Sequence, residues 1–200
     1  MKKILFLLSI MFLSSFIIKA ENFFKIASNY YIIGNYKQAE ENYLKAIKNG
    51  DTRGFRYLGD IYYKQGLYDR SEKMFLKALE TGDTKTYLPL GTLYYTQEKY
   101  EKAEEMYLKG IENGMTSAIT SLGYLYLKQN KLEEAKNQFL KALEQDDIDE
   151  SDISTIYNGL GMTFLVGGDF YTAKEFLKIG AELGNSTSEQ YYTELLEAGY

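Results

Sequence analysis

The segment FRYLGDIYYK at residues 55–64 decides the fold, because its pattern returns at regular intervals along the chain. The pair Leu58-Gly59 recurs 32 residues on as Leu90-Gly91, after another 32 as Leu122-Gly123, and after 38 more as Leu160-Gly161. An aromatic residue follows each glycine by three positions, and a small residue follows it by twelve. Such a fixed period is typical of repeat architectures, in which each unit is one supersecondary element.

Each unit contains two amphipathic segments, because apolar and small residues lie three or four positions apart rather than in alternation. This spacing predicts a helical hairpin in each unit. The predicted fold class is therefore all-α, a right-handed α-solenoid of about five helical hairpins plus a C-terminal capping helix. The units cover about residues 20–51, 52–83, 84–115, 116–147 and 154–185, with an insertion at 148–153 and the cap at 186–200.

Turn and cap signals mark the ends of the expected helices. Three pairs are spaced like capping boxes, in which a side chain accepts a hydrogen bond from a free amide of the first turn: Asn35 with Gln38, Asn130 with Glu133, and Ser186 with Glu189. Four glycines stand where a left-handed residue ends a helix at low cost, namely Gly50, Gly82, Gly114 and Gly184. Pro89 lies near a helix start, so we expect that helix to begin late or to bend.

Small residues explain how the hairpins pack. Gly59, Gly91 and Gly123 are expected to let the two helices of a hairpin approach closely, while aromatic side chains fill the remaining space. In the cap we expect Tyr192 and Leu196 to continue the buried face. A charged residue, Glu189, replaces the apolar residue of earlier units and is expected to prevent further stacking.

The composition disfavours most enzymes. The 200 residues are 45% hydrophobic and 26% charged with a net charge of -5, and they include no histidine and no cysteine. The sequence therefore lacks the imidazole base, the usual zinc ligands and a thiol nucleophile. We predict no catalytic residue, no metal ligand and no cofactor.

The first twenty residues are predicted to be a signal peptide. Lys2 and Lys3 precede an apolar run of fifteen residues, 4–18, and Ala20 offers a small residue for cleavage. The run is shorter than the roughly 20 residues that a spanning helix needs, although a retained membrane anchor stays an alternative. We expect an exported protein, periplasmic or secreted, with residues 21–200 as its domain. Without the leader the net charge is -8, which disfavours binding to nucleic acid or anionic lipid.

The recurring residues resemble tetratricopeptide repeats across nearly the whole predicted domain. The unit at 116–147 carries the family pattern well, with Leu122-Gly123 at the seventh and eighth places, Tyr126 at the eleventh, and Ala135 and Ala142 at the twentieth and twenty-seventh. Its 32 residues are fewer than the family's usual number of about 34. The connection from Ala46 through Gly50 and Gly54 to Leu58-Gly59 instead resembles Sel-one-like repeats.

The tetratricopeptide resemblance implies a scaffold that binds a protein or peptide in a concave groove lined by the first helices. Transferring the groove positions to this sequence selects a candidate set that we call the groove residues: Tyr31, Arg53, Arg56, Asp60, Tyr63, Lys64, Lys85, Thr92, Tyr95, Tyr124, Leu127, Lys128 and Asn158. The same frame includes Glu21 and Leu88. Five basic residues against Glu21 and Asp60 give this surface +3, which favours acidic partners.

Tyr31, Tyr63 and Tyr95 recur in register in this set, and tyrosine is favoured at binding hot spots because it buries a large area and keeps a polar group. Packing of these rings between neighbouring first helices is the alternative.

Other functions are weighed against this one. The acidic cluster Asp146, Asp147, Asp149, Glu150 and Asp152 suggests calcium, but its spacing does not fit a calcium loop. An enzyme acting on cell-envelope polymers would need a pocket with a carboxyl group of raised pKa. A membrane-tethered envelope assembly factor would differ only in keeping its leader. Self-association through Phe23 and Phe24, which have no preceding helix to cover them, is also left open.

Overall fold

The computed structural model describes residues 2–146 and 148–200, with side chains from residue 16 onward. Within these residues the chain forms eleven α-helices, a short 3-10 helix (η1) and no β-strand, which confirms the predicted all-α class. The elements are α1 (Lys2–Ile32), α2 (Tyr36–Lys48), α3 (Gly54–Lys64), α4 (Tyr68–Glu80), η1 (Thr84–Thr86), α5 (Tyr87–Thr96), α6 (Tyr100–Glu112), α7 (Thr116–Lys128), α8 (Leu132–Leu143), α9 (Glu150–Val166), α10 (Phe170–Glu182) and α11 (Ser186–Glu197).

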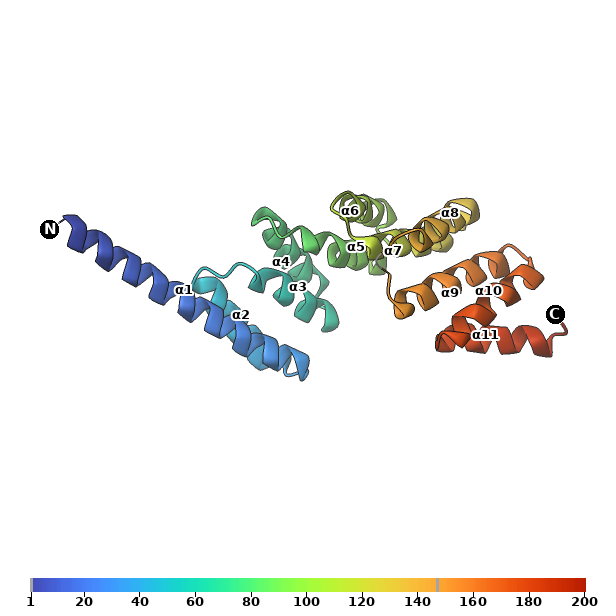
Figure 1. Cartoon of the computed structure of the whole chain (residues 1–200), viewed down its shortest axis with the longest axis horizontal. Coiled ribbons are helices and arrows are strands. Elements are labelled where there is room, and N and C mark those ends of the chain that lie inside the picture. The colour runs from blue at the N-terminus through green and yellow to red at the C-terminus, as the bar shows by residue number, and fades with distance from the viewer. Residues whose placement is uncertain (1, 147) are drawn as a thin grey trace. The chain divides into compact units, whose positions relative to one another are not determined.

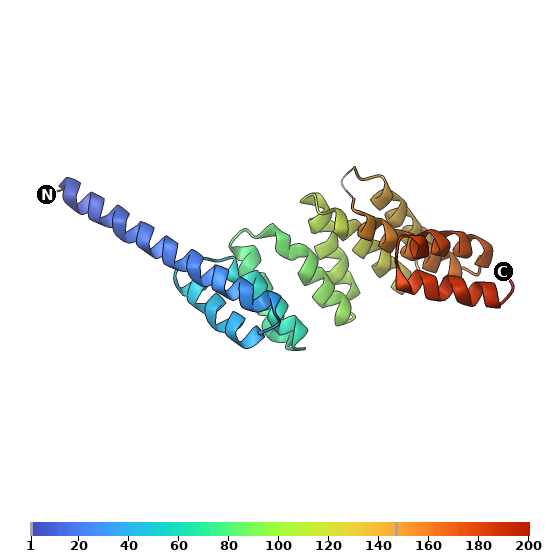
Figure 2. The ribbon, with the colours of Figure 1, turned by 60° about the horizontal axis from the view of Figure 1, so that its bottom comes forward.

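The helices follow one another as hairpins, with α11 after the last pair (Figure 1). The contacts within a hairpin are extensive between α1 and α2, between α3 and α4, between α7 and α8, and between α9 and α10. The fold is an all-α helical repeat solenoid. By its internal contacts the chain divides into an N-terminal unit, residues 1–93, and a C-terminal unit, residues 94–200. In the C-terminal unit α10 packs against both α9 and α11 (Figure 2).

Glycine at the eighth repeat position brings the two helices of a hairpin together. A Cβ atom on Gly59 would lie 2.4 Å from the ring of Phe75 in the facing helix, and a Cβ on Gly123 would lie 2.7 Å from the ring of Phe139. Gly161 has the same relation to Leu177, at 2.6 Å. All three distances are too short for a real carbon contact. The expected close approach is therefore confirmed at Gly59 and Gly123.

The turn inside each hairpin carries one residue with a left-handed backbone. These residues are Gly34, Gly66, Glu98, Asn130 and Gly168, with φ between 58° and 81°. The interpretation of Asn130 as a helix cap is therefore wrong. Asn130 occupies the place of Gly34 and Gly66, because asparagine is one of the few other residues that adopt this conformation readily. The four expected glycines after the second helices, Gly50, Gly82, Gly114 and Gly184, are left-handed as predicted.

Two other predicted caps have different outcomes. Asn35 caps α2 as predicted, since its Oδ1 accepts a hydrogen bond from the amide of Gln38 at 3.3 Å. The predicted cap at Ser186 is wrong by one residue. Asn185 caps α11 instead, and its Oδ1 accepts a hydrogen bond from the amide of Ser188 at 3.0 Å.

Pro89 has the predicted effect on its helix. The chain first forms the 3-10 turn η1 at Thr84–Thr86, and α5 then begins at Tyr87 and is only 10 residues long. Pro89 lies in the first turn of α5, where a missing backbone N–H breaks no bond of the helix.

The capping helix α11 buries Leu195, which is 6% exposed, whereas Leu196 is 48% exposed. The prediction for Leu196 is therefore wrong. Leu196 occupies the repeat position of Tyr62 in α3. The ring of Tyr62 is covered by Arg70 of α4, the second helix of the same hairpin. No second helix follows α11 in the described residues, so Leu196 lacks that cover. Glu189 is exposed, and its role in preventing further stacking stays a prediction.

The helix α1 runs from Lys2 through the predicted cleavage region without a break. Ala20 is 4% exposed in this helix. In the part of the chain that the structure describes, no helix combines the length and the apolar character that crossing a membrane would need. The signal peptide stays a prediction.

Candidate functional site

A pocket of about 330 Å³ opens in the N-terminal unit among α1, α3, α4 and α5. Most of its lining comes from positions of the predicted groove: Tyr31, Asp60, Tyr63, Lys64, Leu88 and Thr92. Phe75 and Pro89 complete it. The structure thus brings together residues from three successive first helices. We call this space the Asp60 pocket.

The tyrosines of the predicted ladder each pair with a second ring across the hairpin turn. Tyr31 lies 5.9 Å from Tyr36 between ring centroids, and Tyr63 lies 5.9 Å from Tyr68. In the C-terminal unit Tyr95 lies 6.1 Å from Tyr100. The three ladder rings are half-buried, so they are packed on one side and accessible on the other. The packing alternative is confirmed for Tyr31, whose ring also contacts Tyr57 of the next first helix at 5.7 Å, and contact of the three rings with a partner stays a prediction.

The partner rings Tyr36, Tyr68 and Tyr100 are not among the predicted groove residues. Their signal is nevertheless present, because they recur at the same 32-residue interval and each follows a ladder tyrosine by five positions. Tyr57 is not among the predicted groove residues either. Its ring stacks on Tyr43 with centroids 5.2 Å apart, and edge contacts with Phe24 and Tyr31 extend an aromatic cluster beside the pocket.

Asp60 is the acidic group of the pocket. Its side chain is half-buried, and burial raises the pKa of its carboxyl group to about 6. The charges of Arg56 and Lys64 oppose this shift, and the charge of Asp83 adds to it. Asp60 forms no hydrogen bond or ion pair with another described residue. Burial and the charge of Asp60 also raise the pKa of Tyr31, to about 12.

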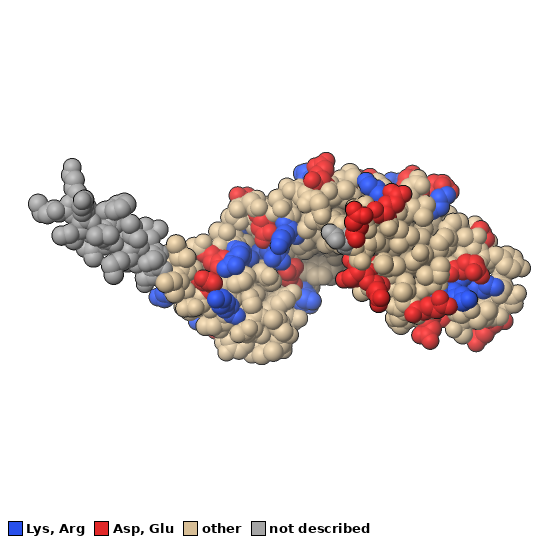
Figure 3. Space-filling view, in the orientation of Figure 1, with Lys and Arg blue, Asp and Glu red and all other residues tan. Residues whose placement is uncertain are grey.

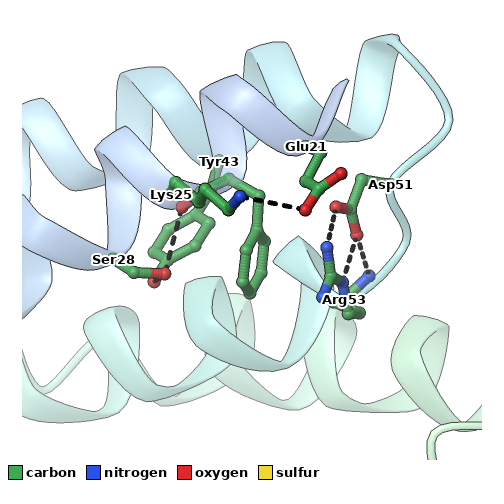
Figure 4. Close-up of polar contacts among 7 residues, drawn as sticks. Glu21, Lys25, Ser28, Tyr43, Asp51 and Arg53 are labelled. Atoms are coloured by element: carbon green, nitrogen blue, oxygen red, sulfur yellow. Dashed lines mark hydrogen bonds and ion pairs between the residues drawn. The ribbon is translucent and has the colours of Figure 1, made fainter. Parts of the chain in front are cut away.

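Arg53 is held by a neighbour outside the predicted groove. Its guanidinium donates to both carboxylate oxygens of Asp51, at 2.9 Å from Nε and 2.6 Å from Nη2 (Figure 4). The same guanidinium lies over the ring of Phe24, 4.1 Å from its centroid. Arg53 is therefore already paired, although its side chain remains exposed.

Arg56 is paired too. Its Nε donates to Oδ2 of Asp83 at 3.0 Å, and its guanidinium lies 4.4 Å from the centroid of Tyr57. Both members of this ion pair are largely buried. Adding Asp51 and Asp83 lowers the net charge of the groove set from +3 to +1. In the view of Figure 3, basic and acidic side chains are interspersed on the N-terminal unit. The structure thus removes most of the predicted basic character.

The other predicted groove residues have separate surroundings. Lys85 is exposed after the end of α4. Thr92 donates its hydroxyl to the carbonyl of Leu88 at 3.1 Å. In the C-terminal unit, burial raises the pKa of Tyr95 and the nearby charge of Lys128 opposes this shift. Leu127 is half-buried and packs against the hydrophobic core of that unit.

Asn158 is buried, so its assignment to an open groove is wrong, whereas Tyr124 is half-buried and its assignment stays a prediction. The Tyr124 hydroxyl donates to the carbonyl of Thr155 at 2.7 Å and to Oδ1 of Asn158 at 3.1 Å. Asn158 is 6% exposed, and its amide donates to the Ser188 hydroxyl of α11 at 3.0 Å. Burial raises the pKa of Tyr124 well above its usual range. The cap α11 thus covers Asn158, a position that the repeat frame alone leaves open.

The N-terminal hairpin is only partly as expected. Phe24 is covered, since its ring packs edge-on against Tyr43 at 5.5 Å and against Tyr57. Phe23 is half-buried with Lys45 over its ring. Other apolar residues of α1 are exposed instead, among them Ile26 at 43% and Ile32 at 79%.

The acidic residues at 146–152 include the N-terminal cap of α9 and two residues of its first turn. Asp149 caps α9, since its Oδ1 accepts a hydrogen bond from the amide of Asp152 at 2.8 Å, and Glu150 and Asp152 lie in the first turn. Acidic residues stabilise this end of a helix dipole. Asp147 lies outside the described residues. Among those described, no group of acidic side chains is arranged to hold a metal ion.

Solved structures with the same architecture span most of this chain. The Pseudomonas aeruginosa pilF protein superposes with a TM-score of 0.75 at 18% identity, covering 90% of this chain and 84% of its own. BtubC from P. vanneervenii has a TM-score of 0.70 at 17% identity, covering 94% and 91%. YrrB, described as a TPR protein with an unusual peptide-binding site, has a TM-score of 0.62 at 21% identity, covering 88% and 89%. These likenesses establish the fold.

The sequence comparisons identify the family. A search of curated protein sequences finds no significant match. Two family models, both described as tetratricopeptide repeat, match residues 24–85, and 84–113 with 116–149. Together they cover more than half of the chain, whereas the Sel-one-like resemblance stays a prediction. Because the matched residues coincide with the helical hairpins, this chain belongs to the tetratricopeptide repeat family.

Proposed function

We propose that this protein is a non-catalytic interaction scaffold that binds an extended segment of a protein partner on its first helices. Tetratricopeptide repeat proteins generally mediate protein–protein interactions. The observation that carries the proposal is the Asp60 pocket, where repeat-equivalent residues of α1, α3 and α5 line one concavity. Tyr31 and Tyr63 give it large apolar surfaces with polar ends, which is the chemistry of interface hot spots.

The Asp60 pocket also bears on the enzyme alternative. The Asp60 carboxyl group has the raised pKa that a general acid requires. The described lining of the pocket, however, includes no second carboxyl group and no histidine that could act as the general base. Paired carboxyl groups are what hydrolysis of a glycosidic polymer commonly uses. A binding role therefore accounts for this pocket better than a hydrolytic one.

The test is capture of partners by the purified protein and by Tyr63→Ala, followed by identification by mass spectrometry. The matched control is Tyr171→Ala, which removes a ring of 66% exposure from the other unit. We expect Tyr63→Ala to lose partners that the control retains, with equal helix content by circular dichroism. The same partners bound by all three proteins would reject the pocket as the binding site.

We also propose that residues 1–20 direct export and are then removed, so that the protein is periplasmic or secreted. The basic start and the apolar run support this proposal. Intact-mass measurement of the native protein tests it, since cleavage removes about twenty residues. A full-length mass would favour the membrane-tethered alternative.

A further inference from the structure

The Asp60 pocket combines apolar walls with one half-buried carboxyl group, that of Asp60, and one basic side chain, that of Lys64. Tyr31, Tyr63 and Phe75 provide aromatic surface, and Leu88 and Pro89 provide aliphatic surface. Asp60 has no hydrogen-bond or ion-pair partner among the described residues. Removing a carboxylate from water without a hydrogen-bond partner costs free energy, and a cation placed beside it would reduce that cost.

The nearby basic residues compensate this carboxyl group only in part, because neither forms an ion pair with it. Arg56 directs its guanidinium to Asp83 at 3.0 Å and lies over Tyr57. Lys64 is one turn further along α3, with an exposed side chain that forms no ion pair within the described residues. In the N-terminal unit, α5 contributes no charged residue at all.

We propose that the Asp60 pocket receives an arginine or lysine side chain of the partner, with its cationic group against Asp60 and its aliphatic stem against Tyr31, Tyr63 and Leu88. This inference rests on the proposed function and specifies the partner chemistry at its anchor. Long basic side chains suit such a site, because their stems bury well and their charged ends need an acceptor. Tyrosine faces add cation–π attraction. The partner is then basic at this position, in contrast to the acidic partner that the groove charge predicts.

The proposal also predicts the pH dependence of binding. The groups that act on Asp60 are Arg56 and Lys64 on α3, Asp83 before η1, and the Tyr31 hydroxyl on α1. With its pKa at about 6, Asp60 is ionised at about pH 7.5 and largely protonated at about pH 5. Affinity for a cationic side chain is expected to fall by up to about tenfold over this interval.

The experiment uses immobilised nonapeptide mixtures whose central residue is fixed as arginine, as citrulline or as glutamate, with the other positions degenerate. Citrulline has the shape of arginine without its charge. Retention of the full chain is compared with that of Asp60→Asn and of the control Asp69→Asn, an exposed aspartate in the first turn of α4. We expect the chain and the control to retain on arginine mixtures about tenfold better than on citrulline mixtures, and Asp60→Asn to lose this preference.

The outcomes separate the inference from the proposed function. Equal binding to arginine and citrulline mixtures, preference for glutamate, or an unchanged arginine preference in Asp60→Asn would overturn the cationic occupant while leaving peptide binding intact. Absence of binding to every mixture would overturn both. Circular dichroism of each variant confirms that a loss of binding is not a loss of fold.

Discussion

Replacement of Gly59 by alanine is a sharp test of how the hairpins are held together. The added Cβ would lie 2.4 Å from two carbons of the Phe75 ring. Phe75 is 1% exposed, so its ring cannot turn out into bulk solvent, and the space beside it is the Asp60 pocket that it borders. Overpacking of this kind costs about 1–3 kcal/mol. Alanine also favours the helical state over glycine by about 1 kcal/mol, which offsets part of that cost.

We expect Gly59→Ala to lower the free energy of unfolding by about 1–2 kcal/mol after this offset. The assay is urea unfolding of the purified protein, followed by circular dichroism at the helix band. The double variant Gly59→Ala/Phe75→Leu should be less destabilised than the sum of its single changes, because the smaller side chain makes room for the methyl group.

Gly167→Ala serves as the control for glycine replacement. A Cβ there would meet its nearest neighbour at 3.4 Å, an ordinary contact, and its backbone is right-handed. Its stability should stay within about 0.5 kcal/mol of the parent chain. If Gly59→Ala is as stable as this control, or if Phe75→Leu fails to relieve it, the reasoning about close helix approach is wrong.

Three further predictions address single contacts. Asn185→Ala should destabilise the protein by about 1 kcal/mol through loss of the α11 cap, whereas Ser186→Ala should be nearly neutral. Thermal unfolding of the two variants measures this difference, and it will show the reverse order if Ser186 is the cap. Tyr62→Phe should lower the free energy of unfolding in urea by about 0.5–1.5 kcal/mol, because the Tyr62 hydroxyl donates a hydrogen bond to Glu40. Tyr171→Phe, at an exposed ring, is the reference. Equal stability of the two variants would show that this hydrogen bond contributes nothing. Folding raises the pKa of Asp60 from its unfolded value of 3.8 to about 6, so the folded state binds the proton more tightly than the unfolded state does. The folded state therefore loses stability, by at most about 3 kcal/mol, as the pH rises through this range. Asp60→Asn should abolish this part of the loss, and urea unfolding at about pH 4 and about pH 7 that shows equal pH dependence in both proteins would contradict it.

The repeat pattern made most of the fold predictable. Gly59 and Gly123 occupy the same repeat position because the same close helix contact requires a glycine in both hairpins. A requirement that recurs at a fixed interval is visible in the sequence. The pocket residues Tyr31, Asp60 and Tyr63 could likewise be chosen from their register. Errors arose where a residue departs from its repeat equivalents, as Asn130 does when it replaces a turn glycine.

The charge of the groove could not be read from the repeat frame. Arg56 pairs with Asp83, which lies 27 residues further along and outside the groove positions. Arg53 pairs with Asp51, which precedes its helix. Whether a basic side chain is available to a partner depends on which acidic residues of the turns lie beside it. The repeat pattern of the helices does not predict these acidic neighbours.

The sequence by itself determined the class of fold, the number of hairpins and the face of each first helix, because helix periodicity and small residues impose these locally. The tertiary structure decided which groups on that face remain available. Packing against α11 buries Asn158 through Ser188, and the junction of α1, α3, α4 and α5 leaves Asp60 without a partner. These outcomes depend on contacts between residues far apart in the chain, whose geometry is fixed only when the helices pack.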